Sequence, residues 1–149
     1  MTQTPNELTL AYLAGFFDGE GCVHISNKGI RGNSLNPSYI LSVHISNTQE
    51  LAVKQFLIFG GQCYRRSRIP PERDLWNWAC AGPKAKAALE KLLPFLKLKK
   101  LEATLGIEFQ TSIRAGCIPL TKQALSFRES CRVTMQKLKG RLPTYVRKN

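Results

Sequence analysis

A stretch near the N-terminus decides the fold, Leu13-Ala14-Gly15-Phe16-Phe17-Asp18-Gly19-Glu20-Gly21. From Leu8 to Phe17, nine of ten residues are apolar or glycine, and Thr9 is the exception. A surface helix carries a single apolar stripe, so a helix that is apolar all round must be buried on more than one side. Such a run is too short to cross a bilayer. It predicts a buried helix, and the small residues Ala14 and Gly15 permit a second backbone to approach closely.

The apolar run gives way to two carboxylates, Asp18 and Glu20, at the end of this helix. A helix C-terminus carries partial negative charge and disfavours anions. Carboxylates placed there need a cation, and Mg²⁺ or Ca²⁺ on carboxylate and backbone oxygens is the natural one. The alternative is a helix stop followed by a glycine turn, with both acids simply solvated.

These nine residues resemble the LAGLIDADG motif of homing endonucleases, with Phe16 and Phe17 at the two hydrophobic positions and Glu20 at the last acid. In that family the motif helices of two domains pack against each other, and the last acid of each binds a divalent metal in the central cleft. The resemblance implies Mg²⁺ at Glu20 and the Gly19 carbonyl, with Ca²⁺ or Mn²⁺ able to substitute. Asp18 is expected to cap a helix end, of its own chain or of a partner, rather than to bind metal.

Size and charge point to one domain with a polyanionic partner. The 149 residues suit a single domain, 1–149, with a core at about 6–115 and a basic C-terminal helix at about 121–140. A formal charge of +12 favours nucleic acid as the partner. Residues 1–27 hold no Lys or Arg but three acids, so an acidic centre lies within a basic protein. This arrangement suits a metal-dependent site that faces phosphates.

The cysteines indicate a reducing compartment. Five are present, an odd number without a CxxC pair, and we interpret them as reduced core residues of an intracellular protein, in an organelle or a prokaryotic cytoplasm. A zinc site using Cys22 and His24 is a minor alternative. Neither a signal peptide nor a membrane span is visible, so we expect a soluble protein without a membrane partner.

Hydrophobic patterning predicts an α+β domain. Alternation over 22–28 and 39–47 indicates a first hairpin with Val23, Ile25, Leu41, Val43 and Ile45 inward. A helix that buries Leu51, Phe56 and Phe59 follows, and then a second hairpin over 62–80 and a helix from Gly82-Pro83 to Pro94. This αββαββα order matches the domain of the family, with a four-stranded antiparallel saddle sheet. Two additional C-terminal helices are expected, over 98–113, with its apolar face at Leu98, Leu101, Leu105 and Phe109, and over 121–140.

One face of that sheet is expected to be free for a ligand, because the helices cover the other. Arginine and lysine suit phosphate or guanine, and Asn, Ser and His suit base edges, so the free face suits double-stranded DNA. Any one of these residues could be an ordinary solvent-facing side chain, and the inference depends on the set. The expected DNA-binding residues are His24, Ser26, Lys28, Arg31, Asn33, Ser42, His44, Arg66, Arg68 and Asn77.

The motif occurs once, which predicts a homodimer. One motif helix leaves half of that helix uncovered, and the simplest cover is the same helix of an identical partner. Two such subunits would read a long, near-palindromic target. The residues expected at this interface are Leu10, Leu13, Ala14, Gly15 and Phe17. From Lys122 onward the chain has eight basic residues and one acid, which indicates either a solvated helix face or a clamp on the phosphate backbone.

The resemblance implies two further catalytic positions beside Glu20. Asn47 would order waters in the cleft, and Lys99, in the segment Pro94–Lys100, would polarise the scissile phosphate or position the nucleophile. Asn47 could instead cap the following helix, and Lys99 could be a solvated residue at a helix start, with Lys100 as the alternative register. The family commonly has a basic residue just after the second strand, where this chain has Leu51.

The function expected from these features is site-specific, Mg²⁺-dependent hydrolysis of both DNA strands by an intron-encoded type of homing endonuclease, leaving short 3′ overhangs. Two alternatives stay open. One is an intron-splicing maturase that binds RNA, and the other is a non-catalytic DNA-binding regulator of the same fold.

Overall fold

The computed structural model describes residues 5–113 and 120–140, and its centre is a four-stranded antiparallel sheet in the order β1-β2-β4-β3. The strands are β1 (Gly21–Asn27), β2 (Tyr39–Asn47), β3 (Gln62–Arg66) and β4 (Leu75–Ala81). The helices are α1 (Glu7–Glu20), α2 (Glu50–Lys54), α3 (Gly82–Leu92), α4 (Lys100–Ser112) and α5 (Lys122–Leu138), with 3₁₀ turns η1 (Gln55–Phe59) and η2 (Leu93–Phe95). The predicted α+β class and αββαββα order are confirmed. The expected boundaries at 1, 115 and 149, and Cys117, lie outside the described residues.

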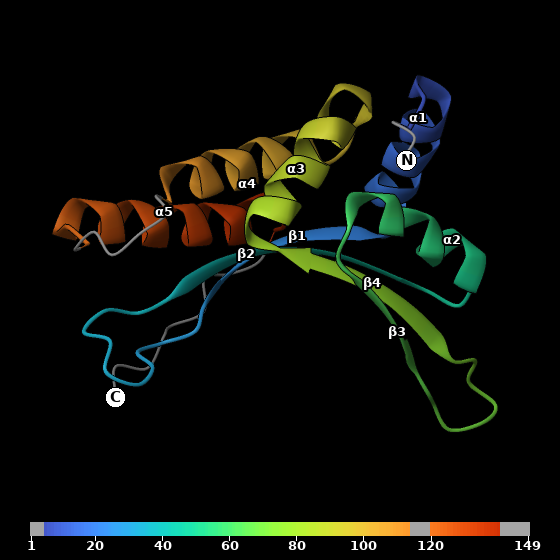
Figure 1. Ribbon diagram of the computed structural model, residues 1–149, viewed down its shortest axis with the longest axis horizontal. Helices are drawn as coiled ribbons and strands as arrows, with labels where there is room; N and C mark the ends of the chain where they lie inside the picture. Colours follow the sequence, from blue (N-terminus) through green and yellow to red (C-terminus); the bar gives the residue numbers. More distant parts are fainter. Residues whose placement is uncertain (1–4, 114–119, 141–149) are drawn as a thin grey trace.

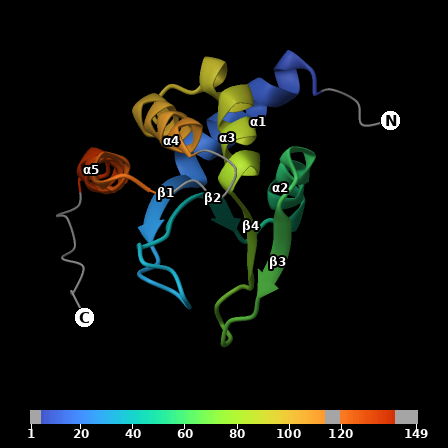
Figure 2. The same ribbon diagram turned by 60° about the vertical axis from the view of Figure 1, so that its left-hand side comes forward.

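The sheet is arched, and the helices lie on its convex side (Figure 1). Both hairpins extend away from the helices as two arms, formed by the ends of β1 and β2 and by the ends of β3 and β4 (Figures 1 and 2). Among residues 5–113 and 120–140, none of the helices combines the length and apolar character that crossing a membrane requires.

The core lies between the sheet and the helices, as the alternating pattern predicts. Five residues expected to face inward are no more than 1% exposed, namely Val23, Ile25, Leu41, Val43 and Ile45. Trp78 is also fully buried, and its Nε1 donates to the Gly60 carbonyl at 2.8 Å. Burial of each such side chain contributes about 2 kcal/mol. The residues that alternate with them must therefore face the concave side.

Two predicted apolar faces are wrong in part. Leu51 is 80% exposed, and Val53 is buried in its place together with Phe56 and Phe59. These three are spaced by three residues, which puts them on one side of a chain that changes from α-helix to 3₁₀ after Lys54, and Leu51 points elsewhere. A basic residue is thus missing after β2, and an exposed leucine takes its position.

In α4 the prediction holds for Phe109, which is buried, and for Leu105, which packs against the core, but small residues take the place of the other two leucines. Leu98 and Leu101 are 76% and 69% exposed, while Ala103, Gly106 and Phe109 are buried. A Cβ added at Gly106 would lie 3.1 Å from the Cδ1 atoms of Leu41 and Leu89. The close approach of α4 to the sheet and to α3 therefore selects small side chains, which a count of large apolar residues overlooks.

A buried carboxylate joins the end of α1 to the start of α4. Asp18 accepts hydrogen bonds from three consecutive backbone N–H groups, those of Lys97 (2.8 Å), Leu98 (3.1 Å) and Lys99 (3.0 Å). Lys99 Nζ donates in return to the Asp18 carbonyl at 2.6 Å. These three residues directly precede α4, which begins at Lys100, and the partial positive charge of a helix N-terminus suits this anion. Asp18 was expected to cap a helix end. It binds at the start of a helix of the same chain, through the turn that leads into α4 rather than through the N–H groups of its first turn.

We predict that Asp18→Asn lowers the free energy of unfolding by about 2–4 kcal/mol, because three hydrogen bonds to a buried charge are weakened together. Glu20→Gln is the matched control, an acid-to-amide change in the same helical turn on an exposed side chain, and it should change stability by less than about 0.5 kcal/mol. Urea unfolding followed by circular dichroism measures both. Equal losses in the two variants would contradict the assigned role of Asp18.

Candidate functional site

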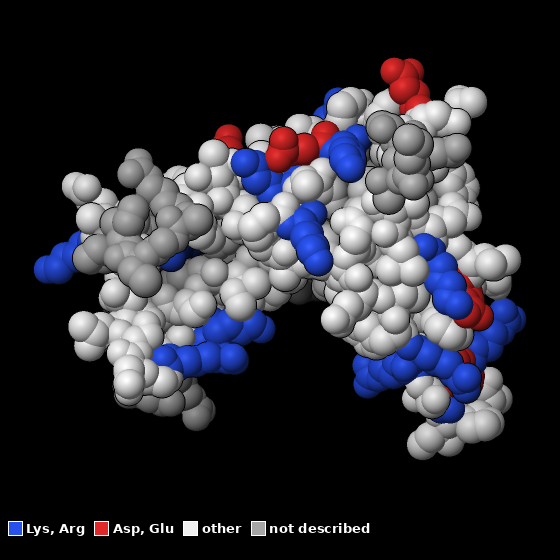
Figure 3. Space-filling model, in the orientation of Figure 1, with Lys and Arg blue, Asp and Glu red and all other residues white. Residues whose placement is uncertain are grey.

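Most of the predicted DNA-binding residues lie on the concave face of the sheet or on the arm between β1 and β2. His24 lies opposite Ser42 in the β1–β2 register, and Ser46 lies opposite Asn77 in the β2–β4 register. His44 is exposed, and so are Lys28, Arg31 and Asn33 in the arm between β1 and β2. In the space-filling view Lys and Arg side chains gather on both arms, around the hollow between them (Figure 3). The face is thus polar, basic and open.

Two of the predicted contacts are committed to protein groups. Arg68 Nε donates to the Arg73 carbonyl at 2.8 Å, its Nη1 donates to Glu72 at 3.2 Å, and its backbone N–H donates to Asp74, so it organises the turn 67–74. Asn77 Oδ1 accepts from Ser46 Oγ at 2.5 Å. The Asn77 amide nitrogen is buried and lacks a hydrogen-bond partner within the part of the chain that the structure describes. Arg68 is near two acids in sequence, and this proximity explains its role in the turn.

The concave face also holds residues that the sequence analysis missed. Tyr64 lies opposite Asn77 and is 53% exposed, and Gln62 lies opposite Ala79. Both precede Arg66 at the spacing of two that a strand requires, so alternation counted back from Arg66 would have placed them there. Arg65 points to the other side of the strand and pairs with Asp74 at 2.7 Å.

Cys22 lies on this face too, and its expected place in the core is wrong. Its Sγ is 3.0 Å from Lys139 Nζ at the end of α5, and it lies opposite His44 on the neighbouring strand. Burial raises the pKa of the Cys22 thiol, but hydrogen bonds from His44 and Lys139 outweigh burial and lower the pKa to about 7. Because β1 is an edge strand, its first residues can contact the C-terminal helix.

The last acid of the motif is exposed at the end of α1. Neither Glu20 nor Gly19 is covered by the subunit, and no described group donates a hydrogen bond to the Glu20 carboxylate. Over residues 5–113 and 120–140, no group of three or more His, Cys, Asp or Glu side chains could hold a metal ion. At the motif the described subunit therefore offers the Glu20 carboxylate and nearby backbone carbonyls, which is an incomplete ligand set for a divalent ion.

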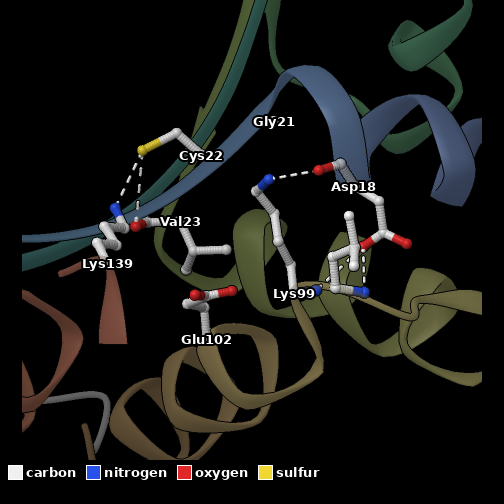
Figure 4. Close-up of a pocket in the computed structure, with 8 residues that line it drawn as sticks. Asp18, Gly21, Cys22, Val23, Lys99, Glu102 and Lys139 are labelled. Carbon is white, nitrogen blue, oxygen red and sulfur yellow. Dashed lines mark hydrogen bonds between the residues drawn. The ribbon is translucent and has the colours of Figure 1, made fainter. Parts of the chain in front are cut away.

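Lys99 is brought to the motif, and Asn47 ends β2 two residues beyond Ile45, which pairs with Gly21. Lys99 lines a cavity of about 370 Å³ with Asp18, Gly21, Cys22, Val23, Leu98, Glu102 and Lys139. Figure 4 shows its amine directed at the Asp18 backbone. Lys100 is exposed and begins α4, so Lys99 is the register that meets the motif. Asn47 Oδ1 accepts from the Gln49 N–H at 2.8 Å, and the N-cap position of α2 is Gln49. Glu20 and Asn47 do not line the cavity.

Three of the five expected interface residues are wrong. Leu13, Ala14 and Phe17 are fully buried in the core of their own subunit, because α1 turns this side toward the sheet and α3. Leu10 is half-buried, and Gly15 is exposed. The uncovered side of α1 carries Leu8, Ala11, Tyr12, Gly15 and Gly19.

Gly15 and Gly19 lie on that uncovered side of α1 with open space around them. A Cβ added at either would meet no atom of the described chain within 4 Å. Glycine inside a helix costs about 1 kcal/mol relative to alanine. Since contacts inside the subunit do not require these glycines, they suit the close approach of a second backbone from outside.

Comparison with solved structures identifies the fold. The homing endonuclease I-CvuI, in complex with the I-CreI target in the presence of 2 mM Mg with the DNA not cleaved, has a TM-score of 0.68 and 22% identity, over 95% of this chain and 87% of that chain. I-TnaI, also a homing endonuclease, has a TM-score of 0.62 and 19% identity, over 88% and 93%.

A third structure carries the family name of the motif. The I-SmaMI LAGLIDADG homing endonuclease bound to cleaved DNA has a TM-score of 0.65 and 19% identity, over 92% of this chain and 47% of that chain. This chain therefore spans about half of I-SmaMI. No protein-family model matches the sequence, and no curated protein matches it. The chain has the fold of the LAGLIDADG homing endonucleases.

Proposed function

We propose that this protein is a site-specific, Mg²⁺-dependent endonuclease that acts on double-stranded DNA as a homodimer. The observation that carries the proposal is the position of Glu20, exposed at the end of a helix whose uncovered side also exposes Gly15 and Gly19. Glu20 directly precedes β1 of the sheet, whose arms carry Lys and Arg side chains (Figure 3). Structures with the same fold were determined with DNA, and that of I-SmaMI contains cleaved DNA.

The proposed dimer is supported by the exposed apolar side of α1. The uncovered side of α1 is apolar or small, and Leu8 and Tyr12 are 83% and 55% exposed. Exposed apolar residues around two glycines suit a second copy of the same helix, related by a twofold axis. A twofold axis parallel to the helix pair would place both Glu20 carboxylates near one seam. Each subunit would then supply one half of a symmetric site.

Paired Glu20 carboxylates, with the Gly19 carbonyls, would hold Mg²⁺, which when bound lowers the pKa of a water nucleophile and stabilises charge on the leaving oxygen. The other roles belong to side chains of this chain. The Lys99 ammonium, held at the Asp18 carbonyl, would place a positive charge beside the scissile phosphate. Asn47 would orient water through its amide N–H groups, since its oxygen already accepts from Gln49.

The arms would place the sheet along the DNA. Two-stranded ribbons fit the major groove, and exposed Lys28, Arg31 and Arg66 suit phosphate and guanine. Two sheets related by the dimer axis would cover a long, near-palindromic target, with the Glu20 pair over its centre. Cleavage across the minor groove there would leave short 3′ overhangs.

The deciding experiment is digestion of a randomised DNA library with Mg²⁺ and, separately, with Ca²⁺. Double-strand cuts at one sequence with Mg²⁺ alone support the proposal. Tight, selective binding without cuts in either ion would indicate a non-catalytic regulator. Rescue of intron splicing without DNA cleavage would indicate a maturase.

We predict that Glu20→Gln reduces cleavage by at least about a thousandfold, because loss of a metal-binding charge removes about 4 kcal/mol of transition-state stabilisation. DNA binding measured in Ca²⁺-free buffer should stay within about threefold of the wild type. Cleavage at the original rate would refute the metal assignment. Glu7→Gln, at the other end of the same helix, is the control and should cleave normally.

We predict that Gly15→Leu yields a folded monomer, because a Cβ at this position meets no described atom within 4 Å, whereas the added side chain blocks approach of a second backbone. Ala87→Leu, an exposed position on α3, is the control that adds the same bulk away from the proposed seam. Sedimentation velocity measures both. A stable Gly15→Leu dimer would show that the subunits meet elsewhere.

We predict that Arg66→Ala relaxes base preference at specific target positions by about tenfold, the discrimination that a bidentate base contact of about 1–3 kcal/mol provides. The neighbouring Arg65→Ala is the matched control, because Arg65 points to the opposite side of β3 and pairs with Asp74. Cleavage profiling over all single-base variants of the target measures both. If affinity falls equally on every DNA, Arg66 contacts phosphate.

A further inference from the structure

A chain of hydrogen bonds runs from α5 to the arm between β1 and β2. The Arg132 guanidinium donates to Glu129 from Nε, at 3.0 and 3.1 Å to the two carboxylate oxygens. Tyr39 Oη donates to Glu129 Oε2 at 2.6 Å and accepts from Asn27 Nδ2 at 3.2 Å. Asn27 Oδ1 then accepts from the Gly29 backbone N–H at 2.8 Å. We call Arg132, Glu129, Tyr39 and Asn27 the α5 relay.

The relay ends at the base of the arm. Asn27 and Tyr39 are the last residues paired between β1 and β2, and the segment 28–38 follows directly. Two backbone hydrogen bonds, Lys28 to Ser38 (2.8 Å) and Ser38 to Gly29 (3.1 Å), continue the ladder for one step. Beyond them the segment exposes Arg31 and Asn33. The direction of this segment therefore depends on its first residues, where the relay binds.

Burial and charge make the relay more than a surface contact. Arg132 is 5% exposed and Tyr39 8%. Burial and the hydrogen bond to Glu129 raise the pKa of Tyr39 to about 12, while hydrogen bonds from Arg132 lower the pKa of the Glu129 carboxyl. A lowered carboxyl pKa means that the stabilisation is present above the usual value and is lost as pH falls through the folded value. At neutral pH the hydroxyl donates to a charged acceptor, which is the stronger kind of hydrogen bond.

We propose that Tyr39 and Glu129 are positioning residues for DNA recognition. Through Asn27 they hold the segment 28–38 in one direction and so determine which base pairs its side chains read. The inference rests on the proposed function and extends it, because it assigns to α5 a role in sequence selection at a distance from the DNA. The other arm provides an internal comparison, since the relay does not reach 67–74.

Hydrogen exchange on the free protein tests the relay without DNA. Tyr39→Phe keeps the buried ring and removes the hydroxyl. Amides in 28–38, Gly29 first, should exchange about fivefold faster, as loss of one hydrogen bond predicts, while those in 62–74 stay within twofold. Unchanged exchange in 28–38, or equal acceleration in both arms, would overturn the relay.

Cleavage or binding profiles over all single-base target variants test the recognition role. In Tyr39→Phe, discrimination between bases should fall about fivefold at the target positions that residues 28–38 contact. It should fall less than twofold at the target positions that residues 67–74 contact. Glu129→Gln keeps an oxygen acceptor for Tyr39 and should give a smaller loss. Cys131→Ala, which loosens the packing of α5 without touching the relay, is the control for general destabilisation and should relax neither set selectively.

A uniform loss across both sets of positions, or the same pattern in Cys131→Ala, would overturn the recognition role. A wild-type protein that neither binds nor cuts DNA would overturn the proposed function and the recognition role together. The exchange measurement still decides in that case whether α5 holds the arm. The two failures are therefore distinguishable.

Discussion

The structure depends on one buried anion, the carboxylate of Asp18, and on the three backbone N–H groups that surround it. The C-terminal end of α1 disfavours an anion and the N-terminal end of α4 favours one, so the Asp18 carboxylate is stabilised when it lies against the turn that leads into α4. This contact fixes the position of Lys99, whose amine returns to the Asp18 carbonyl. It also removes the need for a metal at Asp18, which leaves Glu20 as the acid that still lacks a cation.

The two acids of the motif differ in burial because of where each lies along α1. Asp18 lies within the last turn, where it is covered by the segment that leads into α4. Glu20 is the last residue of the helix, and its side chain is exposed beyond the part of α1 that packs on the core. One short helix therefore provides a buried structural acid and, two residues later, an exposed acid.

The sequence predicted what depends on local periodicity and on the motif. Alternation correctly placed Val23, Ile25, Leu41, Val43 and Ile45 in the core, and the sequence predicted the helix α4. It did not predict which side of α4 is buried, because close packing favours Ala103 and Gly106 over larger leucines there. Nor did it predict the contact between Asp18 and Lys99. It also misplaced Leu13, Ala14 and Phe17, since a helix that is apolar on all sides does not reveal which side faces its own sheet. The position of Cys22 depends on its contact with Lys139, 117 residues along the chain, which only folding brings close. The pairing of Arg68 with Glu72 is local, and the nearby acids in the sequence could have indicated it.

The charge distribution sets a final constraint on any function. A chain with a formal charge of +12 has the exposed acid of its motif at the end of an apolar helix, and Lys and Arg side chains gather on both arms of the sheet. A lone carboxylate binds a divalent ion weakly, because Mg²⁺ and Ca²⁺ take six or more oxygen ligands. DNA phosphates and a second Glu20 would supply the missing oxygens, and the same phosphates would neutralise the arms. In the isolated subunit, Glu20 needs further oxygen ligands to hold a metal, the exposed side of α1 needs a partner helix, and the basic arms need a polyanion. A twofold dimer on DNA would supply all three.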